Sequence, residues 1–296
     1  MINKTFRLFK DEKSSLVSYV LDDGELSMKG RLHPCVVICP GGGYTYVSKN
    51  EGEPVAAFFN SKGYDAFVLN YSVKINHPFP EALSELAIAI AFIRDKAKEW
   101  LIDSTDITVV GFSAGGNLAL SLGVNYGKAF LNTISAGATA AQIKPNALIL
   151  GYPAVCLDSV SKHISKEAED LISKGIIPDF RGPSIQEILI GKENPTSAEK
   201  EHLNLLNYIT SAVPPVFAWN TYEDKVVPPT DTLRLGMKLI ECHVPCEIHM
   251  FQRGAHGLSL ADKTVKDKDD LRDVHASDWK NEALSWLEEL RNSRRK

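Results

Sequence analysis

Short apolar runs alternate along the chain with stretches in which apolar residues recur at helical spacing. The run over 35–39 is apolar throughout and stops at a proline and three glycines, which predicts a strand buried on both faces. Further strands are predicted over 6–9, 16–20, 66–70, 107–110, 147–150, 216–219 and 247–251, and helices over 53–62, 79–100, 114–125, 230–242 and 275–291. This alternation indicates an α/β fold with a mostly parallel central sheet and helices on both faces.

The segment 155–212 interrupts this rhythm. It carries helical patterns over 164–174 and 184–190 but no obvious strand. An insertion between two strands of an open α/β sheet would lie over the carboxyl edge, where such sheets bind ligands. We therefore predict a single domain over 1–296 with a cap-like helical insertion before the strand at 216–219, and surface packing is the alternative.

The charge pattern argues against a nucleic-acid partner. The chain has 33 basic and 37 acidic side chains and a net charge of −4, whereas nucleic-acid binders usually carry a basic stripe. The basic cluster at 291–296 is interpreted as the solvated, frayed end of a C-terminal helix, where the helix dipole favours positive charge.

Other compositional features suggest where the protein works. No run of 18 apolar residues is present, and the first ten residues do not resemble a secretory signal, so no membrane partner is expected. Five cysteines, an odd number, argue against a disulfide framework. We expect a reduced, cytoplasmic protein and leave open whether it forms a homo-oligomer.

The sequence 111–115 has the pattern G-x-S-x-G between a predicted strand and a predicted helix. The serine of such a turn sits in a strained conformation, and small residues are needed two positions before and after it. Its hydroxyl is then exposed at the sheet edge, beside the positive end of the helix. Ser113 is therefore the candidate nucleophile.

A serine nucleophile needs a base and a group that orients the base. In this fold the three residues follow the chain order Ser, Asp or Glu, His. Asp224 follows the strand predicted at 216–219, and His256 follows the strand predicted at 247–251. Glu223 is a rival for the acid, whereas His249 lies inside the last strand and is a weaker candidate for the base.

The glycine-rich loop 40–44 follows the first buried strand. Glycines allow backbone N–H groups to converge on an oxyanion because no Cβ obstructs the approach. The expected partner is the N–H of Ala114, directly after the nucleophile. Tyr44 and Trp219 lie near the predicted edge and are candidates for substrate contact, with simple packing as the alternative.

Taken together, these residues resemble the α/β-hydrolase superfamily, and more narrowly the carbohydrate acetyl esterase or acetylxylan esterase-like group, which is related to hormone-sensitive lipase. The matching segments are 40–44, 51–56, 68–71, 111–116, Asp224 with 227–228, and 254–257. The resemblance implies the α/β-hydrolase fold, a triad of Ser113, Asp224 and His256, and an oxyanion hole made by the N–H groups of Gly42, Gly43 and Ala114. Departures from the related groups are Pro40 and Phe112, where lipase-like members have His and Asp, and Asn117, where acetyl esterases often have His.

The sequence therefore predicts a serine hydrolase of short-chain acyl esters, chiefly acetyl esters of sugars or oligosaccharides. The partner is a small-molecule ester, and neither a metal nor an organic cofactor is expected. The alternatives are an amidase, arylformamidase-like or peptidase-like enzyme on the same triad, or a silent binding module. Because His256 must be neutral to act as a base, activity is expected to fall below about pH 6.

Overall fold

The computed structural model of the chain describes residues 1–9, 14–22, 32–157, 166–174, 183–264 and 275–294. Its strands form one eight-stranded sheet in the order β1-β2-β4-β3-β5-β6-β7-β8. The strands are β1 (Ile2–Phe6), β2 (Ser15–Val20), β3 (His33–Cys39), β4 (Asp65–Asn70), β5 (Ile102–Phe112), β6 (Ala147–Gly151), β7 (Val216–Thr221) and β8 (Cys246–Phe251). Strands β3 to β8 are parallel, and β1 and β2 extend one edge as antiparallel strands. The predicted α/β fold with a mostly parallel sheet is confirmed.

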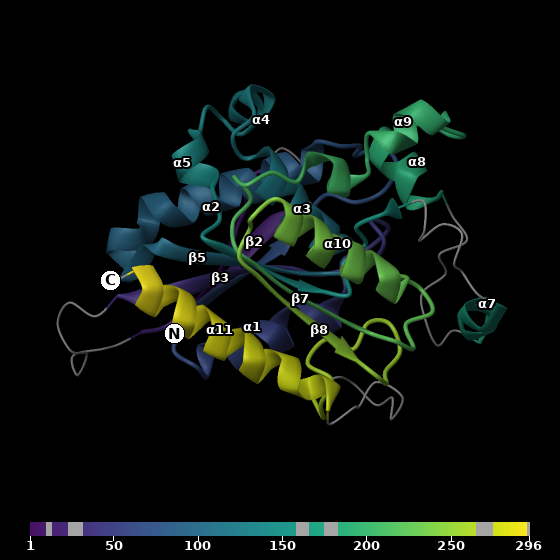
Figure 1. Cartoon of the computed structure of the whole chain (residues 1–296). Helices are drawn as coiled ribbons and strands as arrows, with labels where there is room; N and C mark the ends of the chain where they lie inside the picture. Colours follow the sequence, from purple (N-terminus) through teal and green to yellow (C-terminus); the bar gives the residue numbers. More distant parts are fainter. Residues whose placement is uncertain (10–13, 23–31, 158–165, 175–182, 265–274, 295–296) are drawn as a thin grey trace.

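Helices cover both faces of the sheet (Figure 1). The main helices are α1 (Glu53–Asn60), α2 (Glu81–Trp100), α3 (Ala114–Asn125), α10 (Pro229–Glu241) and α11 (Trp279–Arg294), and shorter ones are α4 (Ala129–Ile134) and α5 (Ala140–Ile143). Helices α2, α3 and α10 pack on one face and α1 and α11 on the other. Within β3, Val37 and Cys39 enter the first core, whereas Val36 and Ile38 enter the second. The strand is therefore buried on both faces, as its sequence predicts.

Two strands, β1 and β5, begin four and five residues before their predicted starts. Strand β1 lies at 2–6 rather than at 6–9. Its side chains are mostly exposed, so the sequence has no alternation of apolar and polar residues from which the strand could be predicted. Strand β5 begins at Ile102, five residues before the predicted start, and pairs there with His33 across an irregularity in register. Its additional residues include Ser104 and Thr105, which are exposed and polar. Burial patterns thus predict only the part of a strand that lies in the core.

The segment 155–212 contains α7 (Lys166–Ser173), α8 (Ile185–Ile190), α9 (Ser197–Glu201) and the short 3₁₀ helix η3 (Leu205–Tyr208). Helices α8 and α9 lie on the right of Figure 1, where the parallel strands end. Helix α8 is attached to the loop before α2, since the Phe79 N–H donates to the Leu189 carbonyl at 2.8 Å. The start of the helix predicted over 164–174 and the residues 175–182 lie outside the described residues, so the cap role of this insertion stays a prediction.

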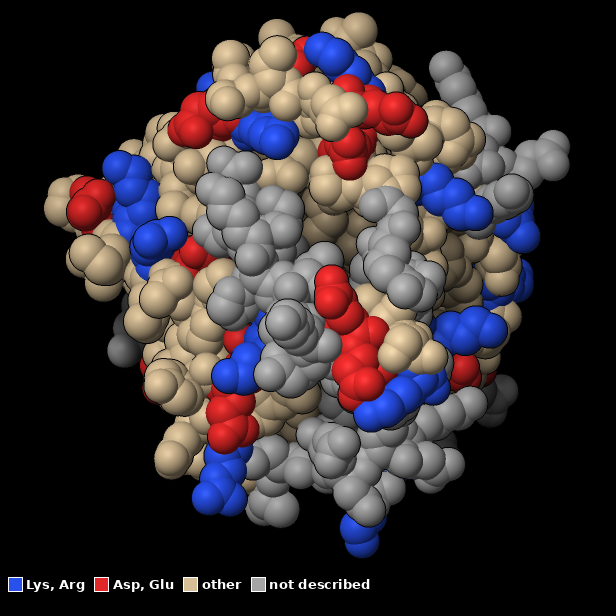
Figure 2. All heavy atoms as spheres, turned by 90° about the vertical axis from the view of Figure 1, so that its right-hand side faces the viewer, with Lys and Arg blue, Asp and Glu red and all other residues tan. Residues whose placement is uncertain are grey.

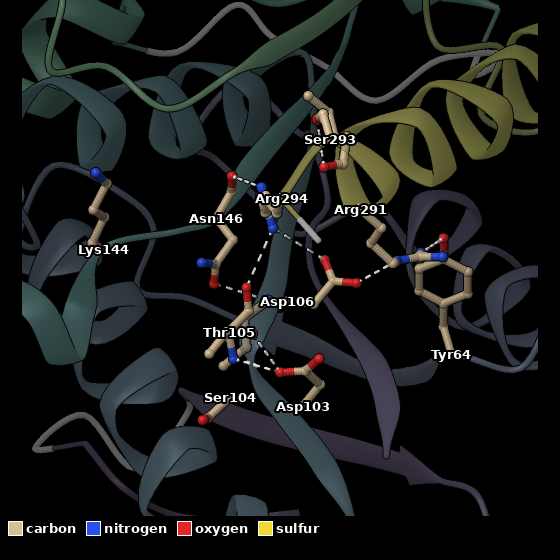
Figure 3. A network of polar contacts seen from close by, with 12 residues as sticks. Tyr64, Asp103, Ser104, Thr105, Asp106, Lys144, Asn146, Arg291, Ser293 and Arg294 are labelled. Carbon is tan, nitrogen blue, oxygen red and sulfur yellow. Dashed lines mark hydrogen bonds and ion pairs between the residues drawn. The ribbon is translucent and has the colours of Figure 1, made fainter. Parts of the chain in front are cut away.

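A network of polar contacts fixes the C-terminal helix α11 to the amino end of the sheet (Figure 3). Arg291 donates to the buried carboxylate of Asp106 and to the hydroxyl of Tyr64. Arg294 donates to the carbonyl of Asn146 at 2.8 Å and to that of Thr105 at 3.3 Å. Contrary to the interpretation of this basic cluster as frayed, its described arginines are paired and attach the helix to β5.

Figure 2 shows the side of the molecule that lies on the right of Figure 1. Basic and acidic side chains are interspersed over the described part of this face, in keeping with the small net charge of −4. Among the helices that the structure describes, none has both the length and the apolarity needed to cross a bilayer.

Candidate active site

Ser113 lies on the sharp turn between the end of β5 and the start of α3. Its φ of 51° and ψ of −118° are a strained combination for a non-glycine residue, of a kind that costs on the order of 1–3 kcal/mol and gathers at functional sites. Helix α3 begins at the next residue, so its N–H groups and positive dipole end lie beside the Ser113 hydroxyl. The turn thus presents the serine at the carboxyl edge of the sheet, as predicted.

The glycines around Ser113 are required by steric contact. A Cβ on Gly111 would lie 2.3 Å from the Gly115 carbonyl oxygen, and a Cβ on Gly115 would lie 2.0 Å from the Cys39 carbonyl oxygen. Both contacts are with backbone atoms, which cannot move aside without distorting β3 or α3. The predicted steric reason for the G-x-S-x-G spacing is therefore confirmed in the structure.

Ser113, His256 and Asp224 form a continuous chain of hydrogen bonds. The His256 Nε2 atom lies 2.9 Å from the Ser113 Oγ atom, and the Nδ1 atom of the same ring lies 2.8 Å from an Asp224 carboxylate oxygen. The carboxylate can only accept, so Nδ1 carries the proton and Nε2 accepts from the serine hydroxyl. This is the arrangement in which an imidazole removes a proton from a serine.

Asp224 is held in place by its own loop. One carboxylate oxygen accepts from the N–H groups of Val226 and Val227 at 2.8 and 2.9 Å, which leaves the other for His256. The residue is only 2% exposed. The rival Glu223 is exposed and accepts a bond from the Gly254 N–H instead. Asp224, not Glu223, is the acid that contacts the histidine.

The surroundings of His256 favour its protonated form. Burial by itself lowers the pKa of this imidazole, but the Asp224 carboxylate and, to a smaller extent, the Glu51 charge raise it more. The net pKa is raised from the ordinary 6.5. The site therefore strengthens His256 as a base and moves the predicted loss of activity toward higher pH than a free histidine would give.

The glycine-rich loop lies directly against the nucleophile. A Cβ on Gly41 would lie 3.0 Å from the Ser113 Cβ atom, and the Gly41 N–H donates to a Glu51 carboxylate oxygen at 2.7 Å. Within the part of the chain that the structure describes, the N–H groups of Gly42 and Gly43 donate to no acceptor. Gly42 has a φ of 127°, a conformation that side-chain-bearing residues rarely adopt. The oxyanion role of these two N–H groups and of the Ala114 N–H stays a prediction.

For both predicted substrate contacts, Tyr44 and Trp219, the structure favours the alternative of simple packing. Tyr44 is 3% exposed, and its hydroxyl donates to the Asn117 side chain at 2.9 Å. Trp219 is fully buried, with ring centroids 5.0 Å from Tyr152 and 5.2 Å from Trp279. Strand β7 continues two residues beyond Trp219, so this indole lies in the core and not at the edge. Tyr44 thus contacts helix α3, and Trp219 packs against Tyr152, whose ring contacts His256.

Sequence reasoning missed two further buried side chains at the site. Glu51 accepts hydrogen bonds from Gly41 and from the Tyr152 hydroxyl, and the Tyr152 ring packs against His256 with centroids 4.9 Å apart. Glu51 stood within a matching segment, but nothing local gave it a role. Tyr152 has one signal in the sequence, its position directly after a buried strand, at the edge where the triad residues gather.

Comparisons with known proteins agree with this geometry. The chain is 30% identical over 230 residues to endo-1,4-beta-xylanase B of Butyrivibrio fibrisolvens. This aligned region covers 77% of this chain and 33% of the relative. It is 26% identical over 259 residues to the acetylxylan esterase of Xylanibacter ruminicola, covering 86% and 46% of the two chains. This chain thus spans less than half the length of either relative.

A solved structure matches nearly the whole chain. The carboxylesterase Cest-2923 from Lactobacillus plantarum superposes with a TM-score of 0.80 and 27% identity, covering 97% of this chain and 96% of the other. The profile of the BD-FAE family matches residues 26–239, which include Ser113, Asp224 and the glycine-rich loop. The chain belongs to the BD-FAE family of the α/β-hydrolase superfamily.

Proposed function

We propose that this protein is a carboxylic ester hydrolase that removes short acyl groups, chiefly acetyl, from sugars or oligosaccharides. The observation that carries the proposal is the chain of hydrogen bonds from Ser113 through His256 to Asp224 at a strained strand–helix turn. This chain supplies a nucleophile, a base and a group that orients the base.

In the acylation step, the Ser113 Oγ atom attacks the ester carbonyl carbon while its proton moves to the His256 Nε2 atom. Asp224 holds the imidazole in the correct tautomer and stabilises the positive charge that forms on it. The carbonyl oxygen becomes an oxyanion and accepts from the N–H groups of Gly42, Gly43 and Ala114. Each such donor is worth about 10²–10³ in kcat.

The tetrahedral intermediate then collapses and its carbon–oxygen bond to the alcohol breaks. The alcohol leaves with the proton that His256 carries, and the acyl group stays on Ser113 as an ester. In the deacylation step, water gives a proton to His256 and attacks the same carbonyl carbon. Release of the carboxylic acid restores the serine hydroxyl and the neutral imidazole.

The substrate class rests on relatives. Two of them carry the names of a xylanase and an acetylxylan esterase, and the matching structure is a carboxylesterase. These names support an acetyl ester on xylan or on an oligosaccharide derived from it. The insertion at 155–212 lies between β6 and β7 in the chain order, and in this proposal it limits the size of the alcohol.

The test compares wild type with Ser113→Ala on p-nitrophenyl esters from acetate to octanoate, followed by acetate release from acetylated xylo-oligosaccharides. The proposal predicts highest kcat/KM for acetate and loss of turnover in the variant. A preference for octanoate would reject the short-acyl assignment. Hydrolysis of formamides or aminoacyl amides, with no hydrolysis of any of the esters, would instead identify an amidase.

A further inference from the structure

The buried carboxylate of Glu51 lies between the glycine-rich loop and the loop that carries His256. Glu51 ends the short 3₁₀ helix η2 (Lys49–Glu51) and is 3% exposed. Among the described residues no basic side chain forms an ion pair with it, and its two oxygens accept from neutral donors. An acid buried without a cation is costly, and the two hydrogen bonds of Glu51 offset part of that cost.

The first hydrogen bond holds the loop that would bind the oxyanion. The Gly41 N–H donates to the Glu51 Oε2 atom at 2.7 Å, and the Gly41 backbone lies against Ser113. The N–H groups of the next two glycines, Gly42 and Gly43, donate to no acceptor among the described residues. A bond to a charged acceptor is stronger than one to a neutral acceptor, and it fixes the loop accordingly.

The second hydrogen bond reaches the histidine loop. The Tyr152 hydroxyl donates to the Glu51 Oε1 atom at 2.7 Å and accepts from the Ser259 N–H at 2.9 Å. The Ser259 hydroxyl in turn donates to the Asn50 carbonyl at 2.7 Å, next to Glu51 in the chain. Tyr152 therefore connects the segment of Glu51 with the loop that carries His256, and its ring makes a T-shaped contact with the imidazole.

We propose that Glu51 is a positioning residue for the ester hydrolysis proposed above, on which this inference rests. One carboxylate fixes the oxyanion loop and, through Tyr152, the loop of His256, so that both halves of the site keep their relative position. The same negative charge also favours the imidazolium that forms during each step. A misplacement of about 1 Å between such groups costs up to roughly 10² in rate.

The charge of Glu51 gives the proposal a pH signature. The titratable groups that face His256 are Asp224 from the loop after β7, Glu51 from η2 and Tyr152 from the loop after β6. The two carboxylates raise the pKa of His256, and Tyr152 stays neutral because burial and the Glu51 charge raise its own pKa well above its usual value. Removal of the Glu51 charge would lower the pKa of His256.

The experiment compares Glu51→Gln, Glu51→Ala and Tyr152→Phe with a matched control, Glu53→Gln, an exposed acid two residues away. Steady-state p-nitrophenyl acetate hydrolysis is measured from pH 5 to 9, and folding is checked by near-ultraviolet circular dichroism. We expect Glu51→Ala to lose about 10² in kcat with KM changed less than threefold, because the loop acts on the transition state. Glu51→Gln keeps one acceptor for Gly41 and should lose about tenfold in kcat.

The acid limb of kcat/KM separates a charge role from simple support. Glu51→Gln should move it to lower pH, whereas Tyr152→Phe, which keeps the charge, should lower kcat without moving it downward. Variants with wild-type kcat, or a folded Glu51→Gln enzyme with an unmoved acid limb, would overturn the inference. An inactive wild type would instead reject the proposed function, so the two failures are distinguishable.

Discussion

Replacement of Asp224 by Asn tests the geometry of the triad with little change of shape. The side-chain oxygen would still accept from the N–H groups of Val226 and Val227, which now lie 2.8 and 2.9 Å away. The new amide nitrogen would then face His256 Nδ1, where the carboxylate oxygen lies at 2.8 Å. Since an amide nitrogen only donates, His256 must place its proton on Nε2.

That tautomer cannot accept the proton of Ser113, so the base is lost while the fold is kept. A wrong tautomer in an otherwise intact triad costs about 10⁴ in kcat, which corresponds to roughly 5.5 kcal/mol of activation free energy. The free energy of unfolding should fall by only about 1 kcal/mol, because both backbone hydrogen bonds persist.

The assay is p-nitrophenyl acetate hydrolysis at pH 8, together with the rate of Ser113 labelling by a fluorophosphonate probe. Glu223→Gln is the matched control: it removes the neighbouring exposed acid and should stay within about twofold of wild type, as surface changes usually do. Asp224→Asn with near-normal kcat, or a larger loss in Glu223→Gln, would refute the assignment of the acid.

Three further predictions follow from other parts of the structure. Gly115→Ala places a Cβ 2.0 Å from a β3 carbonyl oxygen and should lower the free energy of unfolding, measured in urea, by about 1–3 kcal/mol. The control Gly127→Ala adds a Cβ that meets no atom within 4 Å and should leave this free energy unchanged. Equal effects of the two substitutions would contradict the steric argument. Arg291→Met removes the hydrogen bond that Arg291 donates to the buried Asp106 carboxylate (Figure 3) and should lower the free energy of unfolding in the same assay by about 1–3 kcal/mol. The control Ser293→Ala changes an exposed residue and should leave this free energy unchanged. An Arg291→Met protein as stable as wild type would show that the network is dispensable. The kcat/KM of wild type should fall as pH drops through the raised pKa of His256, with its midpoint above 6.5; a profile that stays flat down to pH 5 would argue against a neutral imidazole as the base.

The sequence predicted the triad because each member obeys a local rule. Ser113 needs glycines two positions away, and Asp224 and His256 follow strands whose apolar runs are plain in the sequence. Parallel strands bring their carboxyl ends to one edge, so three residues far apart in the chain were assigned to one site. The structure places them in direct hydrogen-bond contact.

The supporting residues escaped prediction because their roles depend on tertiary contacts. Glu51 and Tyr152 are separated by 101 positions, and neither lies in a local sequence motif that predicts the hydrogen bond between them. The apolar run that ends at Trp219 predicts an edge position for this residue, yet β7 continues through polar Asn220 and Thr221. The bounds predicted for strand β1 are wrong because most side chains of this edge strand are exposed, so its apolar and polar residues do not alternate as they do in a half-buried strand.

The central claim is that Ser113 forms a covalent acyl-enzyme with an acetyl ester. The most direct measurement is rapid mixing of the enzyme with p-nitrophenyl acetate, with quenched samples analysed by peptide mass spectrometry. The account predicts a burst of p-nitrophenol equal to the enzyme concentration when deacylation is slowed, and one acetyl group on the peptide that contains Ser113. Acetylation of a different residue, or undiminished acetylation and turnover in Ser113→Ala, would contradict it.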